Sequence, residues 1–177
     1  VIRYSRKRNP VPADIRGNGL LEAAWMVIPT AIALSMFYVG WQSYIALRTV
    51  PEGALQIGVV GESFFWTFTY PNGKQADVLI VPEGKPVKLN IGSRDVIHSL
   101  FIPALRVKED AVPGIQTYLW FLAEKMGTFD IFCAEYCGLR HSAMLSKLEV
   151  LGVEEYGKWY AGAAPGAPGA KPPEAKG

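Results

Sequence analysis

The sequence has 177 residues, of which 50% are hydrophobic, and it carries a formal net charge of +2. This length supports one ordinary domain with a buried core and a few additional segments. The mean hydropathy is slightly positive, which is high for a purely soluble domain. The sequence shows neither a hydrolytic triad nor a phosphate-binding loop, so hydrolase and nucleotide-binding functions are not favoured.

Residues 23–47 form a long stretch without a charged side chain. As a helix rising about 1.5 Å per residue, the stretch would be roughly 37 Å long, enough to cross a bilayer with some tilt. Pro29 would bend such a helix without breaking it. Interfacial aromatics lie toward its two ends, at Trp25, Tyr38, Trp41 and Tyr44. A buried core helix is the alternative, but core helices rarely run so long without polar residues, so we expect a transmembrane helix over 20–48.

The flank at 1–19 is basic, with five Lys or Arg residues against Asp14 alone. The positive-inside rule predicts that this flank stays in the cytoplasm, or its organellar equivalent, and that the rest of the chain is exported. Nucleic-acid binding is another use of a basic run, but the adjoining span argues against it. A cleaved signal peptide is not expected, because the span is too long. Since the chain begins at Val1 rather than Met, we expect an upstream segment.

From Pro51 onward, apolar residues recur with period two, as in half-buried strands. Turn signals such as P-N-G at 71–73 and P-E-G at 82–84 separate the runs. The expected strands cover 55–60, 64–70, 77–81, 87–91, 115–122, 129–133 and 146–151, and a short helix is expected over 154–160. Many short strands predict an all-β domain over 49–160, an antiparallel sandwich or barrel of Greek-key type. The Pro-, Ala- and Gly-rich residues 161–177 predict a mobile tail.

The strongest chemical signal is the run C-A-E-Y-C-G-L-R-H-S-A-M at 133–144, with His98 upstream in D-V-I-H-S. Thiolate, imidazole and thioether together are the ligand set of copper electron-transfer sites. Two thiolates four residues apart can bridge two metal ions. Taken alone, the cysteines could form a local disulfide on the exported side, and His98 could be a structural histidine. The joint pattern favours copper, since soft donors disfavour calcium and magnesium and the thioether disfavours structural zinc.

From about residue 20 to 160, the chain resembles subunit II of the haem–copper cytochrome c oxidases. L-E-A-A-W-M-V-I-P at 21–29 resembles the start of the second membrane helix of that subunit, and G-E-S-F-F-W-T-F-T-Y at 61–70 resembles its aromatic stretch. The segment 93–114 resembles its first ligand segment. The run at 133–144 matches the loop of the binuclear CuA centre at every ligand position.

The resemblance implies a cupredoxin-like β-barrel with two copper ions. Cys133 and Cys137 would bridge the ions, and His98 and His141 would each ligate one. Met144 and the backbone carbonyl of Glu135 would be the weaker ligands. The Glu135 carboxylate would bind a magnesium ion shared with subunit I, because a hard oxygen suits magnesium.

Two further sites follow from the resemblance. Glu22 matches a glutamate at the mouth of a proton channel into subunit I; the alternative is a helix-end acid in the headgroup region.

Phe64 stands where the family usually has the tryptophan at which electrons enter. Trp66, Phe68 and Tyr70 would keep an aromatic patch, with Phe64 and Trp66 as the entry residues. The change at Phe64 leaves the donor open between a soluble cytochrome, a membrane-bound cytochrome and a fused partner.

The function implied is the electron-entry subunit of a proton-pumping oxidase in a bacterial cytoplasmic or organellar inner membrane, with the copper domain on the periplasmic or outer side. Electrons would come from a c-type cytochrome and pass to haem in subunit I, where oxygen becomes water; subunit III would be a further partner. Direct quinol oxidation is not expected, because quinol-oxidising relatives lack the copper ligands. The alternatives are the CuA domain of a nitrous oxide reductase, disfavoured by the span and Glu22, and a copper-carrier or assembly protein.

Overall fold

The computed structural model describes residues 5–8, 10–11, 14 and 17–162. Most of the expected tail, at 163–177, and parts of the basic flank lie outside the described residues. The chain divides into two compact units, Val1–Ala46 and Leu47–Gly177.

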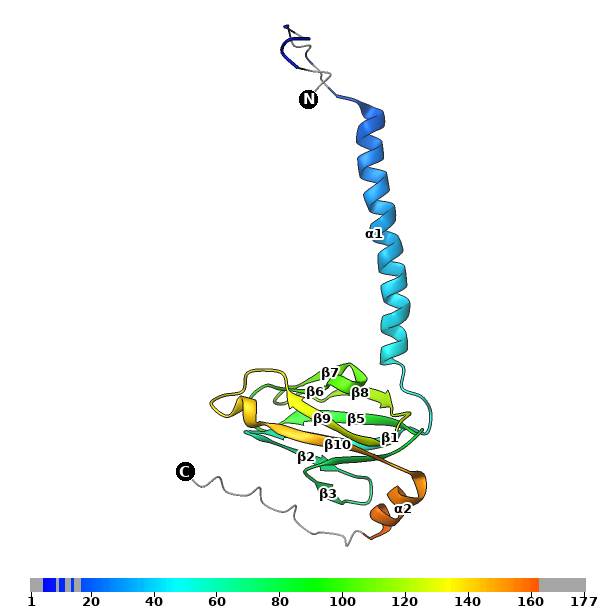
Figure 1. The fold of residues 1–177 in the computed structure, drawn as a ribbon, viewed down its shortest axis with the longest axis vertical. Coiled ribbons are helices and arrows are strands. Elements are labelled where there is room, and N and C mark those ends of the chain that lie inside the picture. The colour runs from blue at the N-terminus through cyan, green and yellow to red at the C-terminus, as the bar shows by residue number, and fades with distance from the viewer. Residues whose placement is uncertain (1–4, 9, 12–13, 15–16, 163–177) are drawn as a thin grey trace. The chain divides into compact units, whose positions relative to one another are not determined.

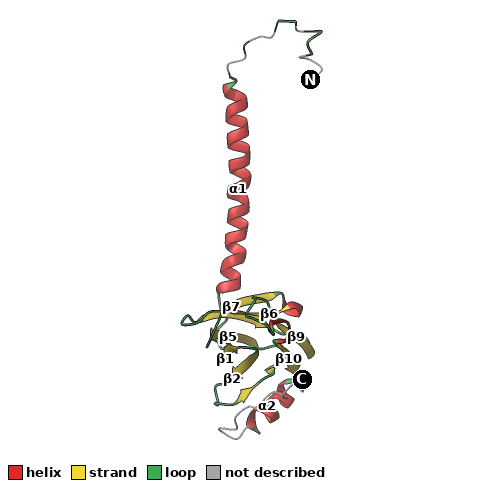
Figure 2. Ribbon diagram, turned by 90° about the vertical axis from the view of Figure 1, so that its left-hand side faces the viewer, coloured by secondary structure: helices red, strands yellow, loops and turns green. Residues whose placement is uncertain are grey.

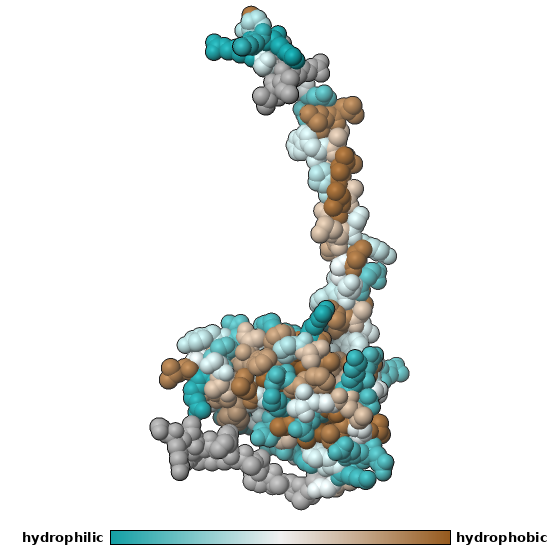
Figure 3. Space-filling model, viewed as in Figure 1, coloured by the Kyte–Doolittle hydropathy of each residue, from teal (hydrophilic) through white to brown (hydrophobic). Residues whose placement is uncertain are grey.

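The first unit contains helix α1, Gly19–Arg48, which includes Pro29 in its interior. Its N-terminus is capped: Asn18 Oδ1 accepts a hydrogen bond from the backbone N–H of Leu21 at 3.2 Å. None of the residues of α1 is buried, and Figure 3 shows apolar side chains along its length. Among the described residues, α1 is the one helix long and apolar enough to cross a membrane. The expected helix over 20–48 is confirmed, and its exposed apolar surface is consistent with a membrane anchor.

Three hydroxyl side chains on α1 make hydrogen bonds inside the helix. The hydroxyls of Thr30, Ser35 and Ser43 each donate a hydrogen bond to the backbone carbonyl four residues earlier, at 2.7, 2.8 and 3.1 Å. Such bonds remove the cost of placing a hydroxyl in an apolar surrounding. The three polar residues are therefore compatible with a membrane-spanning helix.

The second unit is a sandwich of two five-stranded sheets, ordered β3-β2-β1-β5-β8 and β4-β10-β9-β6-β7 (Figures 1 and 2). Helix α2, Val153–Ala161, follows the last strand, where a short closing helix is expected. The strands are β1 Leu55–Glu62, β2 Phe65–Thr69, β3 Gln75–Ala76, β4 Leu79–Pro82, β5 Pro86–Ser93, β6 His98–Ile102, β7 Val107–Ala111, β8 Thr117–Leu122, β9 Gly127–Cys133 and β10 Leu145–Leu151. All seven predicted strands are present.

The core lies between the two sheets because each strand turns every second side chain inward. On β1 and β5, Ile57, Val59 and Leu89 are buried; from the other sheet, Ile131 and Leu148 meet them. The alternation read from the sequence thus identifies the buried face of these strands.

The expectation of a purely antiparallel sandwich is wrong for two strand pairs. β1 pairs parallel with β5, and β4 pairs parallel with β10, while the other pairs between strands are antiparallel. Three strands separate β1 from β5 in the chain, so β5 returns beside β1 in the same direction. Period-two alternation reports which face is buried, whereas strand direction is set by the connections.

Two strands next to the metal ligands were not predicted. β6 and β7 pair antiparallel, joined by the short 3-10 helix Pro103–Leu105 and by Arg106, whose φ is 55°. Alternation in the sequence does not indicate these two strands, because the turn between them interrupts it. β6 carries His98 at its first position and so fixes where that ligand lies.

Candidate metal centre

The ligand residues meet at one end of the second sheet. Strand β6 pairs antiparallel with β9, with Leu100 opposite Cys133, so the start of β6 and the end of β9 lie together. The loop after β9 is held at both ends: Ala134 N–H donates to the Ser99 carbonyl at 2.9 Å, and Cys133 N–H donates to the Met144 carbonyl at 3.2 Å. Strand pairing therefore brings His98 to a loop 35 residues later in the chain.

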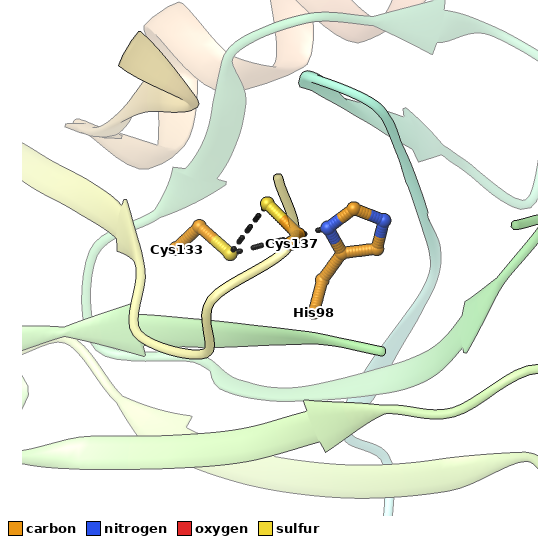
Figure 4. Close-up of side chains that lie close together, drawn as sticks. All are labelled: His98, Cys133 and Cys137. Atoms are coloured by element: carbon orange, nitrogen blue, oxygen red, sulfur yellow. Dashed lines mark hydrogen bonds between the residues drawn. The ribbon is translucent and has the colours of Figure 1, made fainter. Parts of the chain in front are cut away.

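The two cysteine sulfurs and His98 face one another (Figure 4). The Sγ atoms of Cys133 and Cys137 are 3.8 Å apart, and Cys133 Sγ lies 4.0 Å from Nδ1 of His98. Both cysteines are free thiols, so the local disulfide considered from the sequence is not formed. One ligand atom from each of these three residues lies within 4.8 Å of the others, as required for a metal site.

The remaining expected donors complete the cluster. Cys137 Sγ lies 3.6 Å from Nδ1 of His141 and 3.8 Å from Sδ of Met144. Cys133 Sγ lies 3.3 Å from the backbone oxygen of Glu135. Ligand atoms that share a tetrahedral metal with bonds of about 2.0–2.3 Å are roughly 3.3–3.8 Å apart, so these spacings fit a metal-binding cluster.

Burial gives the cluster a low-dielectric surrounding. The side chains of His98 and Met144 are fully buried, and both cysteines are buried. Burial, reinforced by the neighbouring Cys133, raises the pKa of the Cys137 thiol to about 11. The thiol would therefore stay protonated near neutral pH unless a cation replaces its proton. A bound metal ion supplies that positive charge.

His98 is fixed on its other sides by Asp95 and Trp66, of which only Trp66 is expected at the site from the sequence. Its Nε2 lies 2.7 Å from Oδ1 of Asp95, and its ring stands edge-on to Trp66, with centroids 6.0 Å apart. At Gly61 a Cβ atom would lie 3.0 Å from both rings, so glycine leaves the space that they occupy. The signal in the sequence that could indicate Asp95 is its position three residues before His98, in D-V-I-H. Burial tends to raise the pKa of Asp95, but hydrogen bonds from Ser63, His98 and Val96 hold it well below its usual range.

The aromatic stretch is divided between core and surface. Trp66, Phe68 and Tyr70 are all buried, because period-two alternation turns them to the same inner face. These three residues therefore do not form the expected aromatic patch on the surface. Phe64 is partly buried and packs next to Gly138 of the ligand loop, where a Cβ would lie 3.3 Å from its ring. Phe65 is exposed.

The other expected site residues are exposed. Glu135 lies in the ligand loop with its side chain exposed. Glu22 lies in the first turn of α1, and its Oε1 accepts a hydrogen bond from the backbone N–H of Asn18 at 3.4 Å. The roles expected of these two carboxylates stay predictions.

Comparison with known proteins identifies the family. The family model described as cytochrome C oxidase subunit II, periplasmic domain, matches residues 74–151. The chain is 30% identical to a probable cytochrome c oxidase subunit 2 of Rickettsia bellii, over 90% of this chain and 68% of the relative. The chain belongs to the cytochrome c oxidase subunit 2 family.

Further relatives agree with this family. A probable cytochrome c oxidase subunit 2 of Rickettsia felis is 31% identical over 90% of this chain, and the chain spans 58% of that relative's length. The crystal structure of the periplasmic domain of subunit II of cytochrome oxidase from Bradyrhizobium japonicum matches with a TM-score of 0.60 and 31% identity, over 64% of this chain and 95% of that one. The resemblance drawn from the sequence and the cupredoxin-like fold are confirmed. The nitrous oxide reductase and copper-carrier alternatives are not favoured.

Proposed function

We propose that this chain is the electron-entry subunit of a proton-pumping haem–copper oxidase. The cysteines, the histidines, Met144 and the backbone carbonyl of Glu135 would hold two copper ions. These would supply a one-electron redox site between a c-type cytochrome and haem in subunit I, where oxygen is reduced to water. The observation that carries the proposal is the convergence of four donors on two cysteine sulfurs, each donor 3.3–4.0 Å from a sulfur. Family membership supports it independently.

The arrangement of donors supports a pair of metal ions over one. Each cysteine sulfur has an imidazole of its own: Cys133 is next to His98, and Cys137 is next to His141. The two sulfurs lie between the imidazoles and 3.8 Å apart, which suits bridging thiolates. The weaker donors are also divided, with the Glu135 carbonyl beside Cys133 and Met144 beside Cys137.

The donor types favour copper. Thiolate, imidazole and thioether are soft or borderline ligands, whereas calcium and magnesium select oxygen. When bound, copper supplies a one-electron redox site. The protein contributes a buried cage: His98 and Met144 are fully buried, and the backbone hydrogen bond from Ala134 to Ser99 ties the loop to β6. A cage with little freedom keeps the ligands in place in both oxidation states.

The exposed residues around the loop supply surfaces for partners. The partly buried Phe64 packs beside Gly138 of the ligand loop, and we place the contact with the cytochrome donor there. The buried Trp66, whose ring contacts that of His98, would lie between this contact and the metal centre. The Glu135 carboxylate would bind magnesium together with subunit I. On α1, Glu22 would load protons from the cytoplasmic side.

The same function implies an orientation in the membrane. α1 would cross the bilayer next to subunits I and III, with the basic flank inside. The copper domain would lie on the periplasmic or outer side, in keeping with the description of the family model as a periplasmic domain.

The proposal is tested by counting and characterising the bound copper. The full chain in detergent should bind two copper ions and give a multi-line EPR spectrum from one electron shared by both nuclei. Cys137→Ser should abolish this spectrum and leave the sheet content unchanged. Ser142→Ala, an exposed position in the same loop, is the matched control and should keep it. One copper per chain, or an unchanged spectrum in Cys137→Ser, would contradict the bridging assignment.

A further inference from the structure

Asp95 makes a hydrogen bond to the metal-facing histidine that ligand assignments alone do not explain. Its Oδ1 lies 2.7 Å from Nε2 of His98, while Nδ1 of the same ring faces the sulfur of Cys133. An ionised carboxylate can only accept hydrogen bonds, so Nε2 must carry the ring proton. The lone pair of Nδ1 is then free and directed at the cysteine sulfurs. One hydrogen bond thus selects the nitrogen that is available to a metal.

The Asp95 carboxylate is itself held by several donors. Oδ1 also accepts the backbone N–H of Val96 at 2.7 Å. Oδ2 accepts both the N–H and the hydroxyl of Ser63, at 2.8 and 2.5 Å. These bonds restrain a side chain that is 32% exposed and would otherwise rotate. The acceptor for His98 is therefore fixed in place.

Ser63 connects this hydrogen-bond network to the surface beside the site. It lies in the turn between β1 and β2, next to Phe64, which packs by Gly138 of the ligand loop. Asp95 thus joins three elements that are separate in the chain: the β1–β2 turn, the start of β6 and, through the His98 ring, the sulfur of Cys133 at the end of β9.

The second imidazole shows that such support is not shared by both ligands. Nδ1 of His141 lies 3.6 Å from Cys137 Sγ, and the residue is partly exposed. In the described part of the chain, no carboxylate is hydrogen-bonded to its other ring nitrogen. His98 is the oriented imidazole and His141 the less constrained one.

We propose that Asp95 is a positioning residue for the metal centre: it fixes Nδ1 of His98 toward the cysteine sulfurs and ties the β1–β2 turn to this ligand. The inference rests on the proposed copper function for the identity of the metal. The proton position on His98 does not depend on copper. Carboxylate partners of ligating histidines typically change metal affinity by about 10- to 100-fold when removed.

The first experiment is NMR on the metal-free full chain in detergent micelles, with ¹⁵N-labelled histidine. The chain has two histidines, so each ring can be assigned with one His141→Gln variant. Wild type should show His98 as a single Nε2–H tautomer, and Asp95→Ala should show a mixture. Asp95→Asn should keep the Nε2–H form, because its amide oxygen still accepts. Asp130→Ala, which removes an exposed aspartate paired with Lys147, should change nothing.

An Nδ1–H tautomer of His98 in wild type would overturn the proposal, and this result does not require any variant to fold. An unchanged single tautomer in folded Asp95→Ala would overturn it as well.

The second experiment measures copper affinity by competition with a chelator and records the EPR spectrum. Asp95→Ala should bind copper about 10- to 100-fold more weakly, with Asp95→Asn closer to wild type and Asp130→Ala unchanged. If wild type binds two copper ions and Asp95→Ala binds them equally well with the same spectrum, the role of Asp95 fails and the proposed function stands. If wild type binds no copper pair, the proposed function fails, and the tautomer experiment still decides the role of Asp95.

Discussion

Replacing Gly61 by alanine should destabilise the domain and disturb the metal centre together. A Cβ at Gly61 would lie 3.0 Å from Cδ2 of His98 and 3.0 Å from Cζ3 of Trp66. Both rings are fully or almost fully buried, so neither can move away as the end of a flexible side chain could. Overpacking of this kind costs about 1–3 kcal/mol. Removing the conformational freedom of glycine in a strand returns about 0.5–1 kcal/mol, which leaves a net loss of up to about 2.5 kcal/mol.

Gly58 on the same strand is the matched control. Its Cβ would meet Thr69 at 3.7 Å, an ordinary van der Waals contact, so Gly58→Ala should be neutral or stabilising by about 0.5–1 kcal/mol. The assay is guanidinium unfolding of the full chain in detergent, followed by near-ultraviolet circular dichroism of the domain. Gly61→Ala should also alter the copper EPR spectrum, whereas Gly58→Ala should not. Equal unfolding midpoints for the two variants would refute the steric reasoning.

Two further predictions concern single side chains at the site. Phe64→Ala should leave the copper spectrum in place and slow electron transfer from reduced cytochrome c in stopped-flow measurements, because it removes the aromatic ring beside the ligand loop; an unchanged rate would remove Phe64 from the entry path. Met144→Leu should preserve the packing of a fully buried position and shift the copper reduction potential, since it deletes the thioether donor. Met126→Leu, at an exposed methionine, is the control and should leave that potential unchanged. An unchanged potential in Met144→Leu would rule out the thioether of Met144 as a copper ligand.

Much of the fold could be predicted because its signals are local. The uncharged run at 23–47 is enough to indicate α1, and alternation is enough to indicate β1, β5 and β9. Strand direction is not local: the parallel pairing of β1 with β5 depends on how three intervening strands cross between sheets. Strand β7 was missed because its short polar sequence, V-K-E-D-A, has weak alternation and is paired only through β6.

The ligand set could be predicted for a chemical reason: Cys133, Cys137, His141 and Met144 lie within a dozen residues, and few functions other than metal binding need them so close. The surroundings of the site could not be predicted equally well. Gly61 is important only because the rings of His98 and Trp66 meet beside it in space. The inward direction of Trp66 follows from alternation, yet its place against His98 depends on the packing of one sheet on the other.

The pairing of β6 with β9 makes the metal centre depend on the register of two strands. His98 is the first residue of β6 and Cys133 is the last residue of β9, and the pairing of Leu100 with Cys133 sets where the histidine lies beside the ligand loop. Successive side chains of a strand point to opposite faces, so a slip of one residue between these strands would turn His98 away from the cysteines. Every donor residue would then still be present in the sequence, yet the cluster would be broken.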